Sequence, residues 1–128
     1  MALMVAISAG ELIDKITILE IKLENISDPA KLANIRYEHD RLAATLREAI
    51  SESATLSALT QELKSVNAEL WRIEDDIRDQ ERAKTFGAEF IALARSVYRT
   101  NDRRAALKRK IDTFLQSDIV EEKSYAAY

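Results

Sequence analysis

The feature that most constrains this chain is the spacing of its apolar residues, which recur at alternating steps of four and three. Such spacing puts the apolar side chains on one stripe of an α-helix, whereas a half-buried strand alternates with a period of two. Two glycines and one proline in 128 residues are also too few to separate a series of short strands. The sequence therefore predicts an all-α protein with helices over residues 8–26, 29–50, 56–84 and 86–116. We expect one helical domain, 1–128, with an extended arm over 1–7 and a tail over 117–128.

Two of the predicted helices begin with recognisable capping residues. Ser8 and Glu11 have the spacing of a capping box, in which each side chain bonds the backbone N–H of the other residue. Asp28 and Pro29 form a cap followed by a first-turn proline, so a new helix should begin at Pro29. The apolar stripes of 29–50 and 56–84 are out of register, which predicts a break over 51–57. No glycine or proline enforces that break, so a single bent helix is the alternative.

Chain reversals near Asp28 and Phe86 predict an antiparallel bundle of two helical hairpins. At 1.5 Å per residue, helix 56–84 would span roughly 45 Å, but helix 8–26 only roughly 28 Å. The two hairpins should therefore be uneven, and the longer one should project past the shorter one. The stripe spacing also predicts coiled-coil-like packing between helices 56–84 and 86–116.

Helix 8–26 is apolar on nearly every side. Besides its main stripe it carries Ile13, Ile18 and Ile21, which indicates a helix that is buried on more than one face. We expect these three residues to form the interface of a homodimer. The alternative is that the arm, in which Leu3 and Val5 alternate with other residues, covers the second face within one chain.

The composition argues against several classes of partner and site. The chain has no cysteine, which excludes disulfides and thiolate metal ligands and favours a cytoplasmic location. Its 19 basic and 22 acidic residues give a net charge of -3, so we expect no general binding to nucleic acid or membranes. No apolar run approaches the roughly 18 residues that span a bilayer. We expect no cofactor.

Candidate residues for metal chemistry have simpler interpretations. The only histidine, His39, occupies an apolar stripe and is interpreted as a core residue. A di-iron site would need a Glu-x-x-His motif, but the position three residues before His39 is Arg36 and not a glutamate. The acidic run 74–79 and the pair Glu11 and Asp14 offer carboxylates for a hard cation. Asp14 and Asp75, however, are expected to point away from the core, and arginines intersperse the run. We therefore expect a solvated, ion-paired face, no metal site and no catalytic residue.

Helix 86–116 is strongly basic from Arg95 to Lys110, which taken alone suggests phosphate or nucleic-acid contact. The hairpin register predicts internal pairing instead, with Glu62, Glu69, Glu74 and Asp75 on the facing helix. Arg104 lies in the apolar stripe and must find a partner, because an unpaired buried charge is costly. Glu69 and Asp102 are the nearest expected partners.

An aromatic and polar cluster is expected around Arg104, formed by Trp71, Glu74, Tyr98, Thr100, Asn101 and Arg104. One interpretation is structural, because buried polar residues can set the register of packed helices. The other is a site in which Arg104, Tyr98 and Asn101 hold a small anion or a side chain of a partner.

Three stretches, 7–22, 70–112 and 120–125, resemble a bacterial family of short helical proteins of unknown function. The resemblance implies a bacterial origin and a link to genes of cell-surface polysaccharide or glycosylation; it implies no activity. Residues 11–23 also look like the first helix of helical chorismate mutases. Those enzymes bind their dicarboxylate with arginines that include one on this helix, and here the first arginine is Arg36.

We therefore expect a helical interaction or scaffold protein without catalytic activity, which self-associates and binds a larger protein through helix 8–26 or the outer face of helix 86–116. The alternative is a small all-α enzyme or ligand-binding bundle that acts on an anionic metabolite.

Overall fold

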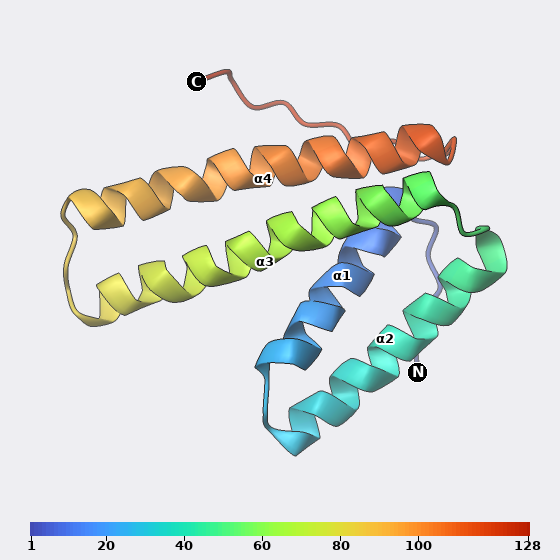
Figure 1. Ribbon diagram of the computed structural model, residues 1–128, viewed down its shortest axis with the longest axis horizontal. Helices are drawn as coiled ribbons and strands as arrows, with labels where there is room; N and C mark the ends of the chain where they lie inside the picture. Colours follow the sequence, from blue (N-terminus) through green and yellow to red (C-terminus); the bar gives the residue numbers. More distant parts are fainter.

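The computed structural model describes residues 1–128 and contains four helices and no strand. These are α1 (Ala9–Asn25), α2 (Pro29–Ala49), α3 (Ala54–Arg82) and α4 (Ala88–Phe114). They pair as two antiparallel hairpins, α1 with α2 and α3 with α4 (Figure 1). The predicted all-α class is confirmed, and no helix end differs from its predicted position by more than two residues.

Polar caps explain where three of the helices begin. Ser8 accepts a hydrogen bond from the Glu11 N–H at 3.1 Å, and Asp28 accepts one from the Ala30 N–H at 3.4 Å. Ser53 accepts from the Leu56 N–H at 3.1 Å, so α3 is separate from α2 and the single bent helix is wrong. In the predicted capping box only the serine half forms, because the Glu11 carboxylate binds lysines instead.

The two hairpins diverge, and the longer one projects past the shorter one (Figure 1). α1 is the one helix that packs against all three others, whereas α2 packs against α1 alone. The main core lies where the first half of α1 meets the first half of α3 and the second half of α4. It consists of Ile13, Leu56, Leu63, Val66, Leu107 and Ile111.

α2 contributes no fully buried residue. Its one histidine, His39, is only half-buried and its Nδ1 lies 3.3 Å from the Asp40 carboxylate. The prediction of a core histidine is wrong, because α2 rests on α1 and nothing covers its other side. None of the four helices combines the length and the apolar character needed to cross a membrane.

The apolar residues of α1 that lie outside its main stripe are covered largely by other helices of the same chain. Ile13 is 1% exposed and lies in the main core, and Ile21 is 2% exposed. The arm does not provide this cover, since the residues from Met1 to Ile7 are all exposed. The alternative in which the arm covers α1 is therefore wrong, and α3 and α4 take that place. Of the three residues predicted for a dimer interface, only Ile18 is partly exposed.

Candidate functional site: an ionic junction and the groove beside it

A buried ionic junction joins α1 to the hairpin of α3 and α4. Arg104 on α4 donates from Nε to Asp14 Oδ1 at 2.9 Å and from Nη2 to Asp14 Oδ2 at 2.5 Å. Asn67 on α3 donates to the same carboxylate at 2.9 Å and to Thr17 Oγ1 at 3.0 Å. Asp14 is 1% exposed, so this is a buried, two-point carboxylate–guanidinium pair.

A second set of charges extends the junction toward the start of α1. Lys108 donates to Glu11 at 2.6 Å and to Glu121 of the tail at 2.8 Å. Asp112, which is buried, accepts from the Gly10 N–H at 2.6 Å and so places a carboxylate at the positive end of the α1 dipole. α1 comes this close to α4 because residue 10 is glycine: a Cβ there would lie 2.5 Å from the Lys108 carbonyl oxygen.

The junction keeps its groups ionised. Burial raises the pKa of Asp14, but hydrogen bonds from Arg104 and Asn67 outweigh that effect and the net pKa is lowered. The hydrogen bond from Lys108 lowers the pKa of Glu11. Burial lowers the pKa of Lys108, and its bonds to Glu11 and Glu121 reverse this and raise it overall. No buried side-chain nitrogen or oxygen in the structure is left without a hydrogen-bond partner.

These contacts correct two predictions. Asp14 does not point away from the core, because α1 crosses the other hairpin and presents its second face to α3 and α4. The partner of Arg104 is accordingly Asp14 rather than Glu69 or Asp102. The sequence held one signal for this result: an acid within a helix that is apolar on nearly every side is itself expected to be buried. Thr17, Asn67, Lys108 and Asp112 carried no comparable signal.

The surface charges follow the predicted pattern in part. Arg103 pairs with Glu69 at 2.9 Å, as the hairpin register predicted, but no ion pair joins α4 to Glu62, Glu74 or Asp75. In the acidic run, Glu74 pairs with Arg78 at 3.3 Å along the same helix. Asp79 likewise pairs with Arg82. The run is thus an exposed face of α3 that is ion-paired in part, since Asp75 and Asp76 form no ion pair.

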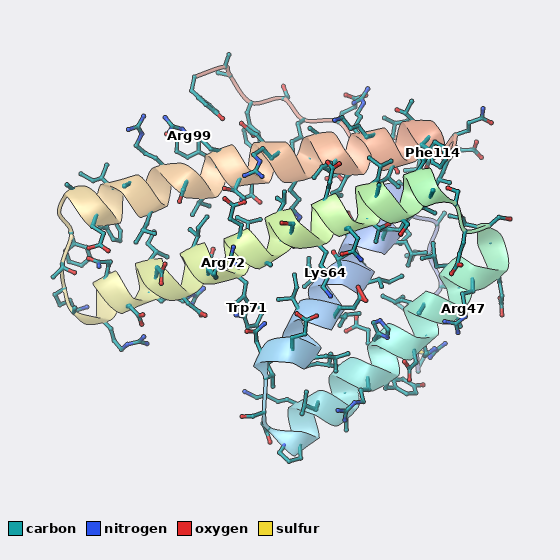
Figure 2. The ribbon with its side chains drawn as sticks, viewed as in Figure 1. Arg47, Lys64, Trp71, Arg72, Arg99 and Phe114 are labelled. Atoms are coloured by element: carbon teal, nitrogen blue, oxygen red, sulfur yellow. The ribbon has the colours of Figure 1, made fainter.

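Beside the junction, the diverging hairpins leave a groove of about 450 Å³, which we call the interhairpin groove. Its apolar residues are Ile18 and Ile21 of α1 and Leu70 and Trp71 of α3; its polar residues are Asn67, Glu74, Asp75, Arg78, Asn101 and Arg104. Trp71 projects from α3 on the side of the other hairpin (Figure 2).

Most of the predicted site residues meet in this groove. Trp71, Glu74, Asn101 and Arg104 line it together with Ile18 and Ile21. Tyr98 does not: its ring packs edge-on against Tyr128 of the tail, with the centroids 5.1 Å apart. Within the groove, the Arg104 guanidinium is already neutralised by Asp14, so the site offers an apolar floor and a rim of two acids and one arginine rather than a free cation.

The chain belongs to a family of unknown function, DUF6165, whose model matches residues 3–128. This confirms the resemblance to a family of short proteins without an assigned activity. No curated protein and no solved structure matches the chain.

Proposed function

Starting from membership of a family with no assigned activity, we propose that this protein is a self-associating helical interaction protein whose interhairpin groove is covered by a second copy of the chain. The observation that carries the proposal is that the chain exposes more surface to solvent than a compact monomer of its mass. A compact monomer of 14.5 kDa exposes roughly 6,900 Å², but this chain exposes 8878 Å². The excess of roughly 2,000 Å², part of which belongs to the exposed arm and tail, exceeds the ~800 Å² that each partner buries in a standard protein interface.

The groove has the composition of an interface. Leu70 and Trp71 provide the apolar and aromatic anchors that usually dominate binding energy, and Ile18 faces them from α1. Its rim carries both signs of charge, with Glu74 and Asp75 near Arg78. A two-fold interface brings the same patch of both copies together, so a patch with both charges can complement itself.

The interface proposed here differs from the one expected from sequence alone. Ile13 lies in the main core, and Ile21 lines the groove but is only 2% exposed, so neither is proposed to contact the second copy directly. Ile18 remains a contact residue. The cysteine-free composition supports action in the cytoplasm, and bacterial origin stays a prediction from the resemblance. Coiled-coil packing of α3 against α4 also stays a prediction.

The anionic-metabolite alternative is less well supported. It relies on Arg104 to recognise the anion, but two N–H donors of that side chain already bind Asp14. A thermal-shift screen with sugar nucleotides, nucleotides and small dicarboxylates tests it: a clear stabilisation by one of these compounds would favour this alternative over the scaffold.

Light scattering over a range of concentrations tests self-association. The wild-type chain should have twice its monomer mass at micromolar concentration, and Leu70→Arg in the groove should weaken the dimer by about a hundredfold because it buries a charge at the contact. Ile91→Arg is the matched control, since Ile91 is an exposed apolar residue of α4 that does not line the groove. A strictly monomeric wild type, or equal disruption by both variants, would overturn the proposal.

A further inference from the structure

The C-terminal tail occupies a strip along α4. At the end of α4 the chain reverses through Gln116, which has a positive φ of 54°, and Ser117 donates back to the Asp112 carbonyl at 2.9 Å. The tail then runs back along α4 on the side away from α3 (Figure 1). Its contacts fall on Tyr98, Asp102, Lys108 and Arg109, which we call the tail strip.

The contacts that hold the tail are few, and the tail's own side of each is exposed. Glu121 binds Lys108 at 2.8 Å and Glu122 binds Arg109 at 3.2 Å, but both glutamates are more than half exposed. At the chain end the Tyr128 ring packs against Tyr98, and the nearby Asp102 carboxylate raises the pKa of the Tyr128 hydroxyl. Exposed ion pairs contribute little to stability. The tail is therefore a weakly held occupant of the strip.

Beyond the end of the tail, the helix face that carries the tail strip continues toward the start of α4 with two cations that have no partner. We call this whole face, from Arg109 to Arg95, the basic stripe. Arg99 and Arg95 precede Asp102 by three and seven positions, which places them on the same helix face. Both are exposed and neither forms an ion pair in the structure. Arg99 points away from α3, toward the side where the tail lies (Figure 2). The tail thus covers only part of a longer basic stripe.

We propose that this stripe of α4, from Arg109 to Arg95, binds an acidic, tyrosine-containing peptide segment of a partner protein, and that the chain's own tail is a built-in competitor for it. The contacts of the tail show which side chains this surface accepts. Two successive glutamates of the tail bind Lys108 and Arg109, and the ring of Tyr128 packs against Tyr98.

A second copy of the chain is not the expected occupant. Its tail would make the same contacts as the resident tail, which has the advantage of being tethered at a high effective concentration. A partner segment gains over the tail by adding acids that reach Arg99 and Arg95. This proposal does not depend on self-association through the interhairpin groove.

The test uses the full chain and a fluorescently labelled synthetic peptide. The peptide has the sequence of residues 117–128 followed by two glutamates, and a scrambled peptide of the same composition is the specificity control. Its affinity is measured by fluorescence anisotropy for the wild type and three variants. These are Glu121→Gln/Glu122→Gln, which releases the tail by removing its two ion pairs without adding cations, Arg95→Glu/Arg99→Glu in the stripe, and Lys31→Glu/Arg47→Glu, which makes the same charge change as the stripe variant on exposed positions of α2.

We expect the peptide to bind the tail-released chain about tenfold more tightly than the wild type, because the competitor is gone. Reversal of Arg95 and Arg99 should weaken binding about tenfold, and the charge-matched α2 variant should bind like the wild type. Absence of binding to the tail-released chain at about millimolar peptide, equal binding of the scrambled peptide, or an equal loss in the α2 variant would overturn the proposal.

Discussion

Asp14 and Arg104 lie 90 positions apart in the chain and form the most buried ion pair of the protein, with two hydrogen bonds between them. The pair ties the first half of α1 to the middle of α4, beside the interhairpin groove that Arg104 also lines. Ile13, next to Asp14 in the chain, lies in the apolar core, so the pair stands between the core and the groove.

Replacement of Arg104 alone should destabilise the fold. Arg104→Met leaves the Asp14 carboxylate buried beside Asn67 without its cation, which costs roughly 3–5 kcal/mol in the free energy of unfolding. The double variant Asp14→Leu/Arg104→Met should recover most of this loss, because no charge is then left unpaired. Urea denaturation of the two single variants and the double variant measures the coupling. If the three effects were additive, the pair would not act as a unit.

Gly10→Ala should be costly although the change is one methyl group. The new Cβ would lie 2.5 Å from the Lys108 carbonyl oxygen and 2.8 Å from the Asp112 carboxylate. α1 must then move away from α4, at a cost of roughly 1–3 kcal/mol. Gly87→Ala is the matched control, since a Cβ at Gly87 meets nothing within 4 Å. Thermal unfolding by circular dichroism compares them; similar melting temperatures for both variants would mean that the close approach is not needed.

Stability should fall in acid. The pKa values of Asp14 and Glu11 in the folded protein lie below their ordinary values of 3.8 and 4.5, so their contribution is fully present above those values. It is lost as the pH falls through the lowered values. The pKa of Lys108 is raised above 10.5, so its contribution is lost only when the pH rises beyond that value.

The unfolding free energy, measured in urea from about pH 2 to 7, should therefore rise with pH in the acidic range and level off near neutrality. Glu11→Gln should flatten part of the rise, whereas Glu52→Gln, an exposed residue with no ion pair, should leave it unchanged. A profile that is the same for wild type and Glu11→Gln would contradict the assignment.

Trp71 should report directly on the groove. It is the only tryptophan of the chain and it lines the interhairpin groove, so its fluorescence depends on whether the groove is covered. On dilution below the dissociation constant of the dimer, its emission should shift to longer wavelength as water reaches the indole. In Leu70→Arg the shifted spectrum should persist up to concentrations about a hundredfold higher than in the wild type. Emission that is independent of concentration in a chain that does dimerise would place the interface elsewhere.

Much of the candidate groove could be predicted from sequence. Trp71, Glu74, Asn101 and Arg104 were placed together by the register of one hairpin, because residues on facing helices are related by their distance from the turn. Tyr98 was placed with them but projects toward the tail, and no periodicity describes a tail without regular structure.

The sequence by itself determined the four helices, the caps of the first two and the pairing within each hairpin. These depend on local properties: the spacing of apolar residues along a helix, the side chains at its first turn and the length of each connection. Only the tertiary structure decided how one hairpin lies on the other, and with it the partner of Arg104, the burial of Asp14 and the cover over Ile13 and Ile21. The physical reason is that a helix which is apolar on two faces can place either face against either neighbour. The choice is made by contacts such as Gly10 against α4, which join residues far apart in the chain.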